Sequence, residues 1–273
     1  MPVLLDVEWL VIGYLTYMTA VAWLGGRAAR ARLILTSAAA ADAAFIAGLA
    51  AIDAPAVAIA REWLPALQVV ICYWLSGLLF VRPMPGLERW LVRSDEAIGR
   101  LIGARRLFDR TPAALVELVE FAYLSVSPML PAGFAVVVAL ASPHDADRFW
   151  TVVLAAGIGC YGMLPWLQTR PPFATMRMDA IEARRIRSRA LTRALMGRVS
   201  IHVNTLPSGH AAGSLATALA VWDQVPAAGP WFLLWSALII VGSVAGRYHY
   251  VVDAITGVLV AVAAYAVRVC CVG

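Results

Sequence analysis

Two short motifs in the chain combine residue types that handle phosphate esters. In the first, Pro207-Ser208-Gly209-His210 precedes an alanine-rich run, which predicts a helix with Ser208 as its N-cap. A helix N-terminus offers backbone N–H groups to an anion, and Gly209 lets a ligand approach the backbone closely. His210 then lies in the first turn, beside the bound group. The alternative is a capped helix whose histidine has no chemical role.

The second motif places His249 and Asp253 four residues apart, on one face of an expected helix start. A carboxylate at that spacing can accept the proton of one ring nitrogen, which leaves the other nitrogen free to attack. The alternative is a structural pair near the membrane surface. Arg170 comes before two prolines that end a helix. Its guanidinium could hold two phosphate oxygens, although an arginine there also suits an ordinary cytoplasmic loop.

The elements that must position these motifs are expected to be membrane helices in an all-α polytopic bundle. The chain has 273 residues, is 62% hydrophobic and 14% charged, and has a mean hydropathy of +0.77. Soluble domains have about 45–50% apolar and about 25% charged residues, so the composition predicts an integral membrane protein. The N-terminus lacks the basic region of a signal peptide. Spanning helices are predicted near residues 9–25, 33–52, 64–81, 113–141, 150–169, 209–223, 230–246 and 250–270.

Three segments depart from a plain spanning helix. Residues 83–110 mix arginines with apolar side chains, which predicts an amphipathic helix on the membrane surface. A second basic segment runs from Arg177 to Arg198. The long helix at 113–141 contains the sequence Ser-Val-Ser-Pro at 125–128, and it is expected to kink or break there.

The arginines predict which side of the membrane the motifs face. All 22 basic residues are arginines, and 19 of them lie in segments on the side of the motifs. Arg61, Arg148 and Arg268 lie on the other side. Short basic loops stay in the cytoplasm, so the site is expected to face the cytosol, although some arginines could instead bind substrate phosphate. The arginine and alanine bias suggests a GC-rich prokaryotic genome and therefore an inner-membrane protein.

The order of the motifs resembles a known family. Arg-Pro at 170–171, Pro-Ser-Gly-His at 207–210 and His-x-x-x-Asp at 249–253 are similar to the three signatures of the type 2 phosphatidic acid phosphatase (lipid phosphate phosphatase) superfamily. The resemblance implies a six-helix membrane core with its signatures at one face. That core would be residues 64–273, and residues 1–63 would be about two additional transmembrane helices.

The resemblance also implies a role for each residue of the motifs. His249 would take the phosphoryl group as a phosphohistidine, Asp253 would orient it, and His210 would protonate the leaving alkoxide. Arg170 and the backbone at 208–209 would hold the phosphoryl oxygens. Such a scheme needs no metal and no cofactor. The expected partners are a membrane lipid phosphate and the lipid bilayer, with no nucleic acid, and the sequence indicates no oligomeric state.

The chain departs from the family signatures at two positions. The lysine that normally lies seven residues before the arginine of the first signature is Met163 here, and the arginine six residues before the third signature's histidine is Ser243. Arg247, two residues before His249, could replace one of these cations. This variant looks like a subgroup related to inositol phosphorylceramide synthases, in which an alcohol takes the phosphoryl group. A lipid phosphotransferase is therefore an alternative function.

Three other classes of function stay open at this point. His210, His249 and Asp253 could hold a metal in a membrane hydrolase, which a chelator would inactivate. The two missing cations also suit a non-enzymatic transporter or assembly subunit with a degenerate site. A serine protease that uses Ser208 is a weak alternative, because the Gly-x-Ser-x-Gly elbow is absent.

Other polar residues in apolar segments have structural interpretations. Glu117 and Glu120 are expected to pair with loop arginines or to favour a helix N-terminus. Asp42 is costly inside a membrane helix unless it has a partner. His144 and His202 have no partner motif and are expected to be incidental.

Overall fold

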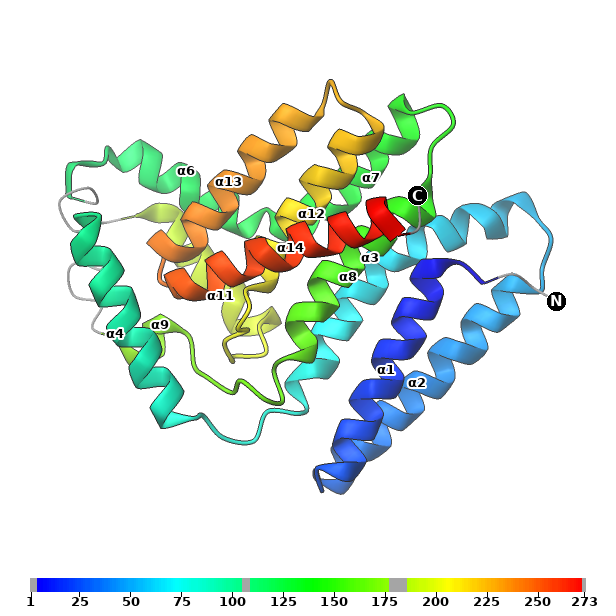
Figure 1. Cartoon of the computed structure of the whole chain (residues 1–273), viewed down its shortest axis with the longest axis horizontal. Coiled ribbons are helices and arrows are strands. Elements are labelled where there is room, and N and C mark those ends of the chain that lie inside the picture. Colours follow the sequence, from blue (N-terminus) through cyan, green and yellow to red (C-terminus); the bar gives the residue numbers. More distant parts are fainter. Residues whose placement is uncertain (1–3, 105–108, 177–185, 272–273) are drawn as a thin grey trace.

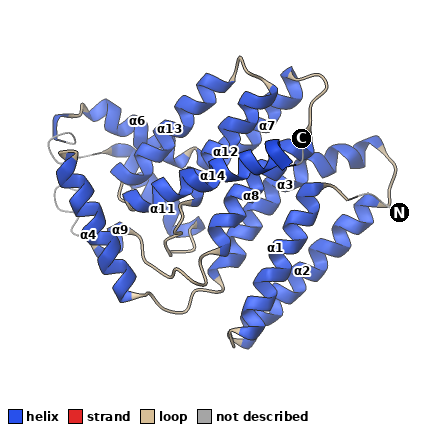
Figure 2. Cartoon of the chain, in the orientation of Figure 1, coloured by secondary structure: helices blue, strands red, loops and turns tan. Residues whose placement is uncertain are grey.

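The chain folds into a bundle of helices (Figures 1 and 2). The computed structural model describes residues 4–104, 109–176 and 186–271. Within these ranges the regular structure is helical, apart from one isolated β-bridge between Thr169 and Asn204, so the predicted all-α class is confirmed. The helices are α1 (Asp6–Leu24), α2 (Ala29–Ala50), α3 (Pro55–Gly77), α4 (Pro85–Leu101), α6 (Ala113–Leu124), α7 (Val126–Leu140), α8 (Ala146–Gly162), α9 (Pro172–Thr175), α11 (Arg187–Val199), α12 (Gly209–Gln224), α13 (Gly229–Ala245) and α14 (Val251–Cys271).

Several of these helices are suited to a membrane. Among the described residues, α1, α2, α3 and α14 are long and apolar enough to cross one, and α6 with α7 forms a bent fifth candidate. The chain is therefore a membrane protein, as predicted. Helices α8, α12 and α13 have 17, 16 and 17 residues. Helices thus occupy all eight predicted positions, but these three are shorter than the ~20 residues of a typical span.

The predicted break in the long helix is present, and one predicted helix start is wrong. Helix α6 ends at Leu124 and α7 begins at Val126, with a bend of 70° between them. The expected third helix begins at Pro55 rather than at residue 64, because a proline is well tolerated in the first turn of a helix. The expected boundary between residues 63 and 64 therefore falls inside α3.

Helix α12 lies at the centre of the bundle and packs against α7, α8, α13 and α14. Its sequence is rich in alanine, glycine, serine and threonine, and small side chains let membrane helices approach closely. The crossing with α14 is especially tight. A Cβ atom on Gly257 would lie 2.5 Å from the carbonyl oxygen of Ser208. This glycine therefore allows the first turns of α12 and α14 to come together.

The two ends of the bundle differ. At one end, ion pairs join different helices: Arg61 with Glu8 at 2.7 Å, Arg148 with Asp223 at 2.7 Å, and Arg268 with Asp6 at 3.8 Å. These are the three arginines predicted to share the side away from the motifs. Helix α4 lies at the other end, where it packs against α9 and α14 (Figure 1).

The two basic segments predicted outside the spans are helical where they are described. Helix α4 lies within the expected amphipathic range 83–110. Helix α11 begins inside the segment 177–198, ends at Val199 just after it, and packs against α6. Residues 105–108 and 177–185 of these two segments lie outside the described residues.

Candidate active site

Backbone hydrogen bonds bring the three motifs together. The Ser208 N–H donates to the carbonyl oxygen of Asp253 at 2.9 Å, which joins the second motif to the third. The Asn204 N–H donates to the carbonyl oxygen of Thr169 at 2.9 Å, which joins the chain just before the second motif to the residue before Arg170. The prediction that the motifs share one face of the bundle is confirmed.

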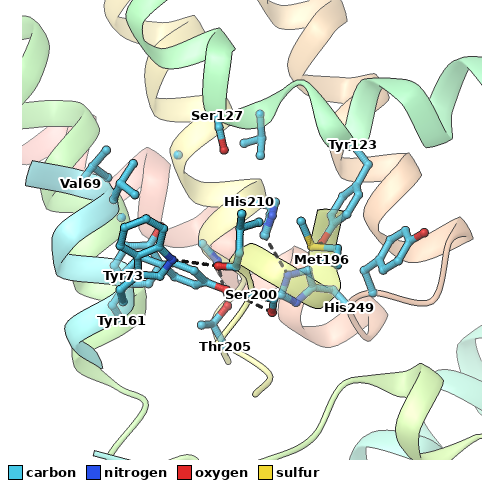
Figure 3. Close-up of a pocket in the computed structure, with 18 of the residues that line it drawn as sticks. Val69, Tyr73, Tyr123, Ser127, Tyr161, Met196, Ser200, Thr205, His210 and His249 are labelled. Atoms are coloured by element: carbon cyan, nitrogen blue, oxygen red, sulfur yellow. Dashed lines mark hydrogen bonds between the residues drawn. The ribbon is translucent and has the colours of Figure 1, made fainter. Parts of the chain in front are cut away.

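The two motif histidines face each other (Figure 3). His249 Nε2 lies 3.2 Å from His210 Nδ1, and His249 Nδ1 lies 3.5 Å from a carboxylate oxygen of Asp253. The same oxygen of Asp253 accepts the Tyr250 N–H at 2.9 Å. His249 is 5% exposed and Asp253 is fully buried. The carboxylate, the first imidazole and the second imidazole therefore form one row that ends at His210.

The predicted helix start is confirmed at Ser208. Its Oγ accepts the Ala211 N–H at 3.3 Å, so Ser208 is the N-cap of α12. The Gly209 N–H donates to Thr205 Oγ1 at 3.3 Å. A Cβ on Gly209 would lie 2.5 Å from the ring of Tyr161, so that ring requires glycine at this position.

The loop that carries His249 is held by Ser243, one of the two positions that depart from the family signatures. The Ser243 carbonyl oxygen accepts the N–H groups of Tyr248 at 2.9 Å and of His249 at 3.0 Å. The Ser243 side chain is buried and donates to the Ile240 carbonyl oxygen at 2.8 Å. Met163, at the other departure, is the C-cap of α8 and is exposed.

Arg170 is held by α4 rather than pointing at the histidines. Its Nε and Nη2 donate to the two carboxylate oxygens of Glu88 at 2.9 Å each, in a forked ion pair. These hydrogen bonds lower the pKa of Glu88 and raise the pKa of Arg170. Arg170 lines a separate hollow of about 490 Å³ with Arg89 and Arg93 of α4. The structure therefore does not bring it into the cavity of the histidines.

Arg247 is also held by α4. Its backbone has a φ of 62°, and its guanidinium pairs with the buried carboxylate of Asp95. The other oxygen of Asp95 accepts the Val251 N–H at 2.8 Å, at the first residue of α14. Arg247 is absent from the described lining of the histidine cavity. Its phosphate-binding role, like that of Arg170, stays a prediction.

His210 and His249 line a cavity of about 530 Å³. One wall is apolar and comes from α3, α7 and α8, with Ala66, Val69, Val70, Leu130, Pro131 and Val153. Aromatic rings cover the histidines, because Tyr123 stacks on His210 at 4.7 Å and on Tyr248 at 4.2 Å between ring centroids. A ligand in this cavity would therefore meet polar nitrogens at one end and apolar side chains at the other.

The cavity also contains residues that the sequence motifs did not single out. Arg189 and Arg193 of α11, together with His202 and Tyr248, line it. His202 was expected to be incidental, but the structure places it on the cavity wall, with a φ of 57°. The signal for the arginines was available in the sequence, because their four-residue spacing puts them on one face of a helix.

The expectation for Glu117 and Glu120 is confirmed. Glu117 accepts the Ser188 N–H at 2.9 Å, at the N-terminus of α11, and Glu120 pairs with Arg189 at 3.3 Å. Glu120 also accepts the hydroxyl proton of Tyr248. Burial, together with this carboxylate, raises the pKa of Tyr248. In α2, Asp42 accepts the Gln68 Nε2–H at 2.9 Å, which gives that carboxylate the partner it was expected to need.

A three-ligand metal site has no support in the described part of the chain. Its His, Cys, Asp and Glu side chains form no group of three that could hold a metal ion. Asp253 lies beside Nδ1 of His249 and His210 lies beside Nε2, so the three side chains do not converge on one point.

The fold and the site define a helical membrane protein with a histidine pair in a partly apolar cavity. The family model described as the PAP2 superfamily matches residues 89–267, which is more than half of the chain. The chain therefore belongs to the PAP2 superfamily, and membership supports a phosphatase-type phosphoesterase. Comparisons with curated proteins and with solved structures give no significant match.

Proposed function

We propose that the chain is a membrane lipid phosphatase that hydrolyses a phosphate ester through a phosphohistidine on His249. The observation that carries this proposal is the row formed by Asp253, His249 and His210. In this row His249 Nε2 and His210 Nδ1 lie 3.2 Å apart, and both histidines line the cavity. A carboxylate behind the first imidazole favours the tautomer with the proton on Nδ1. Nε2 of His249 then carries the lone pair on the side of the cavity.

The proposed reaction has two steps. The substrate phosphoryl group enters the cavity and replaces the contact between the two ring nitrogens, His249 Nε2 forms a bond to phosphorus, and the ester P–O bond breaks. The bound phosphate anion favours the protonated form of His210, which gives its Nδ1 proton to the leaving alkoxide oxygen. In the second step His210 takes a proton from water, the water oxygen attacks phosphorus, and the P–N bond breaks. Inorganic phosphate leaves and both histidines return to their starting states.

The apolar wall of the cavity supports a lipid as the substrate. Trp74 of α3 lines the cavity and is 50% exposed, so the cavity reaches the outer surface of a candidate membrane helix. A lipid tail could enter there from the bilayer while its phosphate meets the histidines. We propose that the site faces the cytoplasm, because 19 of the 22 arginines lie in segments on its side. We propose a prokaryotic inner membrane because of the arginine and alanine bias of the chain.

A lipid phosphotransferase is the second candidate. The cavity of about 530 Å³ exceeds the needs of a phosphate group alone, so an alcohol acceptor has room beside the donor. In that case the alcohol oxygen, rather than water, attacks the phosphohistidine.

The test is phosphate release by the detergent-purified chain from a panel of lipid phosphates, with EDTA present and lipid products followed by mass spectrometry. We expect His249→Ala to lower the rate on the order of 10³-fold or more. The matched control is His144→Ala, since His144 pairs with Glu62 at the other end of the bundle. Free phosphate that survives EDTA and depends on His249 supports the phosphatase, whereas a headgroup moved to another alcohol supports the transferase. Activity that survives His249→Ala contradicts both.

A further inference from the structure

The charged side chains among the described residues that line the cavity are all basic. Among its described lining residues, Arg189, Arg193, His202, His210 and His249 are the side chains that carry or can carry positive charge. Aspartate and glutamate are absent from that described lining. A cavity with this composition favours an anionic ligand over a neutral or cationic one.

Helix α11 turns one face toward the cavity. Arg189, Arg193, Met196 and Gly197 repeat at the helical spacing and all line the cavity. Arg187 and Arg198 of the same helix are not part of the described lining. The rotation of α11 about its axis therefore brings Arg189 and Arg193 to the cavity.

Contacts with α6 fix that rotation. Glu117 accepts backbone N–H groups at the first turn of α11, where a carboxylate also stabilises the helix dipole. Arg189 pairs with Glu120, and the two side chains are only 7% and 2% exposed. Because the buried pair lies one turn from Arg193, it holds the neighbouring arginine at the cavity as well.

The same helix face lies close to the histidines. The Tyr123 hydroxyl donates to Met196 Sδ at 3.7 Å, and the Tyr123 ring stacks on His210 at 4.7 Å. Figure 3 shows Met196 and Tyr123 on the same side of the cavity as the histidine pair. The Tyr123 side chain therefore lies between Met196 of α11 and His210, the ring that faces His249.

We propose that Arg193 and Arg189 of α11 form the phosphate subsite of this cavity, where they supply the positive charge missing at Met163 and Ser243. The proposal rests on the proposed function. Arg193 is exposed and lines the cavity, and a guanidinium has five N–H donors, so it can fork onto two phosphoryl oxygens in addition to its other contacts. Arg189 is fixed by Glu120 and adds a positive group deeper in the same wall.

The test uses inorganic phosphate as the probe, titrated calorimetrically into the detergent-purified full chain. We expect Arg193→Gln to weaken phosphate binding about tenfold or more, which is the loss of one charge-assisted hydrogen-bonded contact. Arg198→Gln removes the same charge from the same helix outside the cavity lining and is expected to stay within about twofold. Arg193 is exposed, so its variant should keep the wild-type melting temperature. His249→Ala should still bind phosphate.

The outcomes separate this proposal from the proposed function. Wild-type phosphate affinity in Arg193→Gln, or an equal loss in Arg198→Gln, overturns the subsite even if phosphate release from lipids is intact. A selective loss in Arg193→Gln supports the subsite, and it does so even if the wild type hydrolyses none of the lipid panel. A wild-type chain that binds no phosphate overturns the subsite.

Discussion

Helices α4 and α11 are both rich in arginine and both adjoin the motif residues, but they do opposite things. Helix α4 supplies carboxylates, Glu88 and Asp95, which hold Arg170 and Arg247 outside the histidine cavity. Helix α11 supplies Arg189 and Arg193 to the wall of the cavity. Helix α4 holds the motif loops from outside the cavity, and α11 lines the cavity that the histidines face.

The difference shows that the position of an arginine in a motif does not decide what it binds. Arg170 and Arg247 lie within or beside the signature residues, yet each has a carboxylate partner on a different helix. Arg189 also has such a partner, Glu120, but that carboxylate is outside the described cavity lining while the arginine belongs to it. The two kinds of arginine therefore differ in the helix that carries the partner carboxylate, which is α4 for Arg170 and Arg247 and α6 for Arg189.

The largest effect is expected from Asp95→Asn. Asp95 is a buried carboxylate that holds both Arg247 and the first N–H of α14, so its loss should cost about 2–3 kcal/mol of stability. Thermal melting of the purified chain measures this, with Glu96→Gln as the exposed control on the same helix. Phosphate release should fall while phosphate affinity stays at the wild-type value. A loss of phosphate affinity with an unchanged melting temperature would mean that α4 takes part in phosphate binding, and α4 and α11 would then no longer differ in role.

A smaller effect is expected from Gly257→Ala, which changes the crossing of α12 and α14 and alters no residue of α4 or α11. The added Cβ would lie 2.5 Å from the Ser208 carbonyl oxygen, so α12 and α14 must move apart at a cost of about 1–2 kcal/mol. Phosphate release should fall because the shift separates His210 from His249. Gly13→Ala is the matched control, since a Cβ there meets nothing within 4 Å. Equal activity in the two variants would show that the tight crossing does not set the histidine geometry.

The smallest effect is the pH dependence of the pair between Glu88 and Arg170. The pair lowers the pKa of Glu88 below its ordinary value of 4.5, so its stabilisation is complete above that value and is lost as the pH falls through the lowered pKa. The melting temperature of the wild type should exceed that of Glu88→Gln near neutral pH, and the gap should close in acid. Melting curves between about pH 3 and pH 7 test this. A gap that stays constant over this range would mean that the charge of Glu88 does not hold Arg170.

Much of the site could be predicted because its signals are local. The i, i+4 spacing of His249 and Asp253 and the N-cap at Ser208 each depend on a few adjacent residues, and both are present in the structure. The all-α class, the break near Ser125 and the convergence of the motifs at one end also follow from apolar lengths and helix punctuation.

The partners of the arginines could not be predicted because they depend on long-range packing. Arg170 meets Glu88 only where α4 folds back against the motif loops, and Arg193 faces the cavity only because Glu117 and Glu120 set the rotation of α11. Sequence spacing fixes which residues share a helix face, but not which neighbour that face meets. The start of α3 at Pro55 was missed for a different reason, since the polar residues Arg61 and Glu62 mask the helical pattern there.

The most direct test of the central claim is to trap the phosphoryl group on the enzyme. The wild-type chain is mixed with a lipid phosphate carrying a radiolabelled phosphoryl group and is quenched within one turnover in base. We expect a label on the protein that is stable in base and labile in acid, that maps to His249, and that is absent from His249→Ala. Phosphate release at the wild-type rate without any such label, or an equal label on His249→Ala, would contradict a phosphohistidine at this position.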